Sequence, residues 1–254
     1  MFIGTGTLVN ACSVLVGSAI GVLIGHRLPE RTRTVVTDGL GLVTLLIAGS
    51  SAMAVSDEAF SDAVGDAATM LIVLGSLLIG AIIGSLARIE DRLEGLGDVL
   101  QRRLSGHPED GAAVDHAARD RFIQGFVTSS LVFCVGPLTI LGSINEGLGN
   151  GADQLLLKAA LDGFAAIAFA AAYGWGVAAS VITLVVVQGS LTVVGAVLGD
   201  FLPDAHLAAL TATGGLLLVG VAFRLLNIKQ VKVGDLLPAL LIAPVLTEVV
   251  IWFR

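Results

Sequence analysis

Charged residues are scarce in this sequence of 254 residues: they make up 14%, where a soluble domain usually carries about 25%. So few charges cannot cover the surface of a water-soluble protein of this size. Apolar runs of about 20 residues recur instead, the length that a helix needs to cross the hydrocarbon core of a bilayer. The short alternating segments of a membrane β-barrel are absent. The composition therefore predicts an all-α polytopic membrane protein.

Further absences narrow the function. The two cysteines, Cys12 and Cys134, fall in apolar segments without a metal-ligand spacing, and we interpret both as small buried side chains. No basic residue precedes Arg27, so the first apolar segment is interpreted as a retained span and not as a signal peptide. No HExxH, GxSxG, serine–lysine dyad or run of acidic ligands occurs. We therefore expect no enzyme activity, no cofactor, no metal and no nucleic-acid partner.

Eight apolar segments have the length of a spanning helix, at about 4–25, 34–54, 67–87, 122–143, 154–172, 177–198, 206–225 and 235–252. Twelve basic residues lie in the loops 26–33, 88–121 and 224–234, against two, Lys158 and Arg254, on the opposite side. Basic loops face the cytoplasm in inner-membrane proteins. We therefore expect a multi-pass protein of the bacterial inner membrane with both termini outside, in contact with the lipid bilayer.

One spaced pattern occurs twice, at a constant offset of 174 residues (195 − 21). The first copy comprises Gly21, Gly25, Leu28-Pro29, Thr37 and Gly41-Leu42, and the second comprises Gly195, Gly199, Leu202-Pro203, Thr211 and Gly215-Leu216. The predicted orientation puts the first Leu-Pro turn inside and the second outside, so the copies are inverted. Spans 1 and 2 then pair with spans 6 and 7. Inverted repeats are typical of secondary transporters, whose sites lie where the repeats meet.

The whole of 1–254 is interpreted as a single transmembrane domain. Its first repeat covers about 4–87, spans 4 and 5 cover about 122–172, and the second repeat covers about 177–252. The segment 88–121 between them is expected in the cytoplasm, with an amphipathic helix over 88–104 that lies in the membrane interface. The polar loop that follows holds His107, Asp110, Asp115 and His116, which have no ligand spacing, so a solvated loop is favoured over a metal site.

Glycines four residues apart occur in three spans, as Gly21/Gly25, Gly80/Gly84 and Gly195/Gly199. Such pairs form a flat face that another backbone can approach closely. Close internal packing is the favoured interpretation. A substrate groove and a dimer face are the alternatives, and the second leaves a homo-oligomer open.

Prolines near the middle of two spans mark candidate broken helices, Pro137 in span 4 and Pro244 in span 8. A central proline removes a backbone hydrogen bond, and broken helices are where transporters bind substrate or ion. A simple kink in a packed helix is an equally good interpretation.

Polar side chains inside spans supply the candidate binding residues. Asp162 in span 5 is a costly carboxylate, which Lys158 can offset at i,i+4 spacing. Glu248 lies near the outer end of span 8 and can reach water. The other candidates are Asn10 in span 1, Ser129 and Thr139 in the unusually polar span 4, and Gln188 in span 6.

Four segments of the chain carry a family resemblance: VNACSVLVGSAIGVLIGHRLPER, LARIEDRLEGLG, LVFCVGPLTILGSINEGL and DLLPALLIAPVL. Together they resemble the bacterial membrane family catalogued as domain of unknown function 554, over nearly the whole chain. The resemblance implies an integral inner-membrane protein, and transport is the role that members are commonly given. One departure is visible, because small residues usually follow FCVG in that family where Pro137 stands here.

Two functions fit these observations. The first is a secondary transporter or channel-like permease for a small solute or ion, with a site between spans 1, 4, 5 and 6. The alternative is a non-transporting membrane scaffold that binds a protein through its GxxxG faces. Transport predicts polar groups that point into a cavity at mid-membrane, whereas a scaffold predicts a packed centre with those groups bonded to one another.

Overall fold

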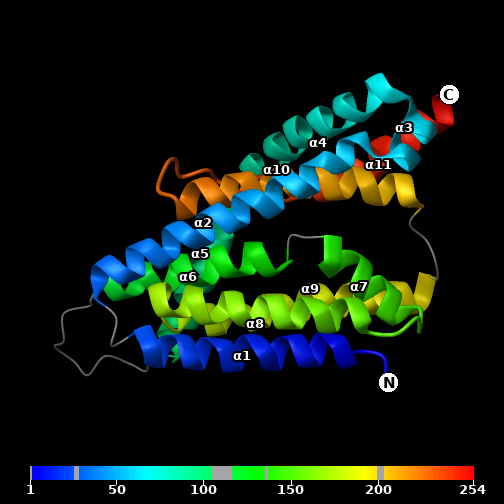
Figure 1. Cartoon of the computed structure of the whole chain (residues 1–254). Helices are drawn as coiled ribbons and strands as arrows, with labels where there is room; N and C mark the ends of the chain where they lie inside the picture. The colour runs from blue at the N-terminus through cyan, green and yellow to red at the C-terminus, as the bar shows by residue number, and fades with distance from the viewer. Residues whose placement is uncertain (1, 26–28, 105–115, 135–136, 199–202) are drawn as a thin grey trace. The chain divides into compact units, whose positions relative to one another are not determined.

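The computed structural model describes residues 2–25, 29–104, 116–134, 137–198 and 203–254, and every regular element in these ranges is a helix (Figure 1). The α-helices are α1 (Thr5–Gly25), α2 (Glu30–Ala52), α3 (Glu58–Val64), α4 (Asp66–Ala87), α5 (Ile89–Leu104), α6 (His116–Cys134), α7 (Pro137–Gly147), α8 (Asp153–Tyr173), α9 (Gly176–Leu198), α10 (Asp204–Leu225) and α11 (Pro238–Phe253). Two 3-10 helices, η1 (Met53–Ser56) and η2 (Gly234–Leu236), precede α3 and α11.

Seven helices of the described chain are long and apolar enough to cross a membrane: α1, α2, α4, α8, α9, α10 and α11. Two further helical segments, Ala117–Cys134 and Leu138–Gly147, are long and apolar enough to cross a membrane when taken together. They form a bent pair whose axes meet at 74°. The all-α polytopic fold is therefore confirmed, and the count is eight if the bent pair is one span. The predicted amphipathic helix over 88–104 is α5.

The helices form two compact units, which are described separately. The first comprises residues 1–40, 91–134 and 138–197, and so contains α1 and α5 to α9. The second comprises residues 41–90, 135–137 and 198–254, and so contains the second half of α2 and all of α4, α10 and α11, together with the short helices α3, η1 and η2.

In the first unit, α1 and α8 pack closely and run parallel. A Cβ added at Gly6 would clash with Leu155, and one added at Gly25 would clash with the backbone of Ala171, so residue numbers rise together along the two helices. Between these ends, Gly17 and Gly21 likewise lie against the backbone of α8. The small residues of α1 are therefore used for close packing inside the unit.

The bent pair follows α9 over most of its length. Gly176, the first residue of α9, lies against the carbonyl of Phe122 in α6, and Ser130 of α6 donates a 3.2 Å hydrogen bond to Thr183. Near the other end of α9, Gly195 lies against the carbonyl of Ile144 in α7. Because α6 lines the first half of α9 and α7 the second half, the two half-helices follow α9 in the same direction, which is the arrangement expected of one broken span.

The second unit is built around α10, in which 72% of the most apolar stretch of 18 residues is buried. Gly215 of α10 lies against the backbone of Ala48 and Ala52 in α2, and Gly80 and Gly84 of α4 lie against the backbone of residues 235 and 239. The predicted close packing at Gly80/Gly84 and Gly21/Gly25 is thus observed. Gly199 lies outside the described residues.

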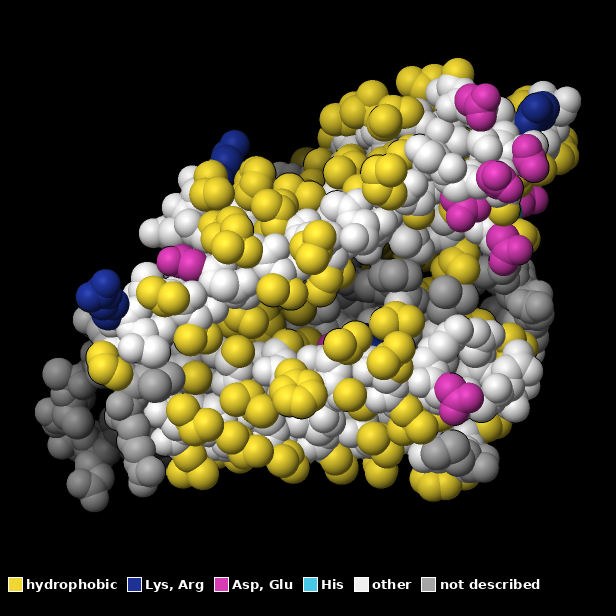
Figure 2. Space-filling model, in the orientation of Figure 1, with side chains coloured by type: hydrophobic (Ala, Val, Ile, Leu, Met, Phe, Trp, Pro, Cys, Tyr) yellow, Lys and Arg dark blue, Asp and Glu magenta, His cyan; other side chains and the backbone are white. Residues whose placement is uncertain are grey.

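Large apolar side chains are exposed along the flanks of the spanning helices, as Figure 2 shows for one face. Leu46, Leu86, Phe164 and Leu241 are each more than 70% exposed, which suits contact with lipid tails. Cys12 is exposed on α1, so our interpretation of it as a buried side chain is wrong, while Cys134 is half-buried. Lipid tails are apolar, so a small apolar side chain such as Cys12 gains nothing from burial when it faces lipid.

The prediction of a broken helix at Pro244 is wrong, because α11 runs without interruption from Pro238 to Phe253. A single proline withholds one N–H, and the flanking turns hold the helix together. At Pro137, by contrast, one helix has ended at Cys134 and another begins.

Candidate functional site

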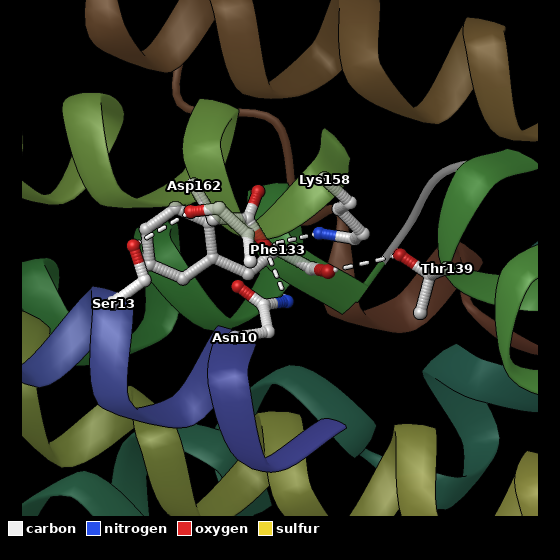
Figure 3. Close-up of polar contacts among 7 residues, drawn as sticks. Asn10, Ser13, Phe133, Thr139, Lys158 and Asp162 are labelled. Carbon is white, nitrogen blue, oxygen red and sulfur yellow. Dashed lines mark hydrogen bonds and ion pairs between the residues drawn. The ribbon is translucent and has the colours of Figure 1, made fainter. Parts of the chain in front are cut away.

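A buried ion pair lies near the middle of α8. The ammonium of Lys158 donates to Asp162 Oδ2, and Asn10 Nδ2 of α1 donates to the same oxygen at 2.9 Å (Figure 3). Lys158 is 5% exposed, Asp162 is 7% exposed, and Asn10 is fully buried. By helix rise, Asp162 lies about 13 Å from the start of α8, so the charges lie well inside a helix of spanning length.

The break between α6 and α7 is defined by the ends of the two helices, and Phe133 and Thr139 at these ends lie beside the ion pair. Thr139 Oγ1 in the first turn of α7 donates a 3.0 Å hydrogen bond to the carbonyl of Phe133, in the last turn of α6, and Figure 3 shows this bond next to Lys158 and Asp162. Carbonyls in the last turn of a helix have no partner within the helix. The hydroxyl of Thr139 satisfies one of them and ties the two half-helices together.

Gln188 of α9 lies level with the break. The Ser130–Thr183 contact sets an offset of 53 (183 − 130) between the parallel helices α6 and α9, so Gln188 is level with the end of α6. Its side chain is fully buried, and neither atom of its amide has a hydrogen-bond partner within the described structure. A buried amide without partners is costly, which makes Gln188 a candidate ligand for a polar guest.

Most buried polar atoms without a partner belong to the first unit. Besides Gln188 they are found in Thr7, Asn10, Ser18, Ser129, Ser143, Glu146 and Thr192, whereas His206 supplies such an atom in the second unit. Native interiors leave few polar atoms unpaired unless water, an ion or a ligand reaches them. The interior of the first unit is therefore equipped to hold polar species.

Glu146, near the end of α7, is a buried carboxylate that sequence reasoning missed. Its Oε1 accepts a 2.5 Å hydrogen bond from the backbone N–H of Gly6, in the first turn of α1, while its Oε2 has no partner in the described chain. A carboxylate at a helix N-terminus satisfies an orphan donor and the helix dipole. A lone acid at the end of an apolar run was the available signal.

The structure brings three of the five predicted binding residues together and places a fourth at the same level along the helices. Asp162, Asn10 and Thr139 lie together beside the break, and Gln188 is level with it. Ser129 is fully buried on α6 and has no hydrogen-bond partner in the described chain, and no contact joins it to the pair. Glu248 is 67% exposed at its side chain and bonds His206 at 2.9 Å, in the second unit.

Metal-ligating side chains do not cluster: within the described ranges, no group of three or more His, Cys, Asp or Glu could hold a metal ion. Of the loop residues considered above, His107, Asp110 and Asp115 lie outside the described residues, and His116 begins α6.

Several helices of spanning length with exposed apolar flanks define a polytopic membrane protein. Residues 5–248 match a family described as "Protein of unknown function (DUF554)". The chain is 32% identical over 251 residues to "Uncharacterized protein YqgA" of Escherichia coli (strain K12), covering 98% of each. It is 26% identical over 245 residues to "Uncharacterized membrane protein YdfK" of Bacillus subtilis (strain 168), covering 96% of each.

No solved structure matches the chain. The family match covers almost the whole sequence, and both relatives align along nearly their full length. The chain therefore belongs to the DUF554 family, as the sequence resemblance predicted.

Proposed function

We propose that this protein is a secondary transporter or channel-like permease that moves a small solute or ion across the bacterial inner membrane, with both termini outside. Asn10, Thr139, Asp162 and Gln188 line its binding region, and Lys158 belongs to it as well. The protein catalyses no covalent reaction.

The observation that carries the proposal is the buried Lys158–Asp162 pair beside a helix break. Charges inside a membrane span are expensive, so they are by default functional. Discontinuous helices expose backbone groups to a guest at mid-membrane, and such breaks are where transporters bind substrates and ions. The unpaired amide of Gln188, level with the same break, gives further support.

The scaffold alternative draws less support from the same contacts. A protein that docks a partner through glycine faces needs those faces free, whereas Gly21 and Gly25 pack on α8, and Gly80 and Gly84 pack on residues 235–239. The polar groups that should distinguish a transporter from a scaffold fall into two sets. Asn10, Asp162 and Thr139 are hydrogen-bonded to protein groups, while Gln188 and Ser129 have no hydrogen-bond partner in the described chain.

The test is solute flux in proteoliposomes that contain the purified full-length protein. Stopped-flow light scattering follows swelling after mixing with iso-osmotic polyols, alkali-metal salts or sodium salts of small anions. We expect at least one class to enter faster than in protein-free vesicles, and Asp162→Asn to abolish that excess. Asp204→Asn, at an exposed position on α10, is the matched control. If no class enters faster, transport is refuted.

A further inference from the structure

The charges of the candidate site restrict what can enter it. Lys158 and Asp162 carry opposite charges and sum to zero, and both are at least nine-tenths buried. A net charge in a low-dielectric interior is costly. A metal cation that joined the pair would raise the net charge to +1 or +2 beside an ammonium. A monoanion alone would lower it to −1.

A monoanion and a proton together leave the net charge at zero. When Asp162 takes up a proton, its carboxylate becomes neutral, and the ammonium of Lys158 loses its counter-charge. An anion bound to Lys158 then restores neutrality. The empty site (Lys⁺, Asp⁻) and the loaded site (Lys⁺, anion⁻, Asp–H) both have a net charge of zero. Neither state therefore places a net charge in the low-dielectric interior.

Free donors on Lys158, and unpaired groups level with it in the first unit, favour an anion over a neutral guest. An ammonium has three N–H donors, and Asp162 is the one partner of Lys158 among the described residues. The amide nitrogen of Gln188 is buried and unpaired, level with the break. The amino end of α7, the positive end of a helix dipole, begins at the same break.

We propose that the Lys158–Asp162 pair binds a small monoanion together with one proton, which makes the protein a proton–anion symporter. This inference rests on the proposed function and deepens it. Lys158 holds the anion, Asp162 carries the proton, and Asn10 keeps the Asp162 carboxyl oriented in both protonation states.

Few other titratable groups face Asp162. Lys158 lies on its own helix, and α6 contributes the half-buried thiol of Cys134. The nearest acid on α7 in contact with α1 is Glu146, which bonds the N–H of Gly6, four residues before Asn10. Helix α1 contacts Asp162 through Asn10, which does not titrate, and the thiol of Cys12 on α1 is exposed. Helix α9 has no titratable side chain. Glu146 is therefore the second acid whose titration the test must separate from that of Asp162.

The first experiment follows protons in proteoliposomes loaded with a pH-sensitive dye. Inward gradients of sodium chloride, nitrate, lactate or pyruvate are imposed, with protein-free vesicles as the background. We expect at least one anion to acidify the lumen above background, at a rate that a potassium–valinomycin potential does not change. Lys158→Gln should abolish the acidification of the lumen, whereas Lys229→Gln, at an exposed position, should not.

The second experiment measures anion binding by thermal shift, which does not require transport. Because each anion takes up one proton, its apparent affinity should rise about tenfold per unit fall in pH while Asp162 is ionised. Asp162→Asn mimics the protonated carboxyl and cannot take up a proton, so it should bind the anion equally well across about pH 6–9 and exchange it without moving protons. Glu146→Gln should keep the tenfold slope.

The outcomes separate the two proposals. If a neutral solute or a metal cation swells the vesicles but no anion acidifies the lumen, symport is wrong and transport stands. If no solute moves at all, both are wrong. A pH slope that persists in Asp162→Asn, or that disappears in Glu146→Gln alone, also overturns the assignment of the proton to Asp162.

Discussion

Glu90, at the start of α5, should be among the most important polar residues for the stability of the second unit. It is 3% exposed, its Oε2 accepts a 2.5 Å hydrogen bond from the N–H of Gly234, and its Oε1 accepts from Arg224. Its own N–H donates to Asp235 Oδ1 at 3.0 Å. One carboxylate thus connects the start of α5 with the end of α10 and with η2.

The expected cost of Glu90→Gln follows from what it leaves unpaired. The Arg224 side chain is 13% exposed, and removing one partner of a buried pair costs about 3–5 kcal/mol. An amide can satisfy one of the two donors, but its NH₂ group then faces the other. With about 2–4 °C per kcal/mol for a chain of this size, the melting temperature should fall by roughly 6–20 °C.

The assay is thermal unfolding of the purified protein in detergent, arranged as a double-mutant cycle of Glu90→Gln and Arg224→Met. The double variant should recover part of the loss, with a coupling above about 0.5 kcal/mol. Glu94→Gln, at an exposed position one turn further along α5, is the control and should change little. If the two single effects add, the reasoning about this pair is refuted.

Three further predictions concern other parts of the molecule. Gly84→Ala should destabilise the protein by about 1–3 kcal/mol, because its Cβ would clash with the backbone of Asp235, whereas Gly49→Ala, with nothing within 4 Å, should not; unfolding in detergent compares them. Reporter fusions at residues 60 and 203 should lie outside and those at 30, 110 and 230 inside, and a cytoplasmic signal at 203 would contradict both topology and inversion. The hydrogen bond from Arg119 lowers the pKa of Asp98 from its ordinary value of 3.8. The stabilisation from this contact should therefore be complete above pH 3.8 and be lost as the pH falls through the lowered pKa of Asp98. Unfolding curves in acid should show this dependence for the unchanged protein and not for Asp98→Asn.

Local patterns predicted the elements because they depend on neighbours in the sequence. Apolar length gave the spanning helices, the i,i+4 spacing gave the Lys158–Asp162 pair, and the helix break falls at Pro137. Long-range contacts were beyond such patterns. Gly6 and Glu146 are 140 residues apart, and Gly234 and Glu90 are 144 apart. No periodicity in the sequence reports which backbone N–H will meet which carboxylate.

The inverted repeat stays a prediction, but helix directions in the first unit bear on it. The first copy begins in α1 and the second in α9. Helix α1 runs parallel to α8, α8 runs antiparallel to α6, as Gly125 lies against Tyr173 while Phe133 meets Phe169, and α6 runs parallel to α9. Therefore α1 and α9 run in opposite directions, as inversion requires.

The candidate site also lies within the unit that holds the first helix of each copy. Asn10 belongs to α1, Gln188 belongs to α9, and the Lys158–Asp162 pair belongs to the inserted span between the copies. If the copies are related by inversion, Asn10 and Gln188 belong to equivalent helices of opposite direction in the unit that holds the pair, which is the arrangement of a site between inverted repeats. Superposition of α1–α2 on α9–α10 about an axis in the membrane plane is the decisive measurement, and Pro29 should then fall on Pro203.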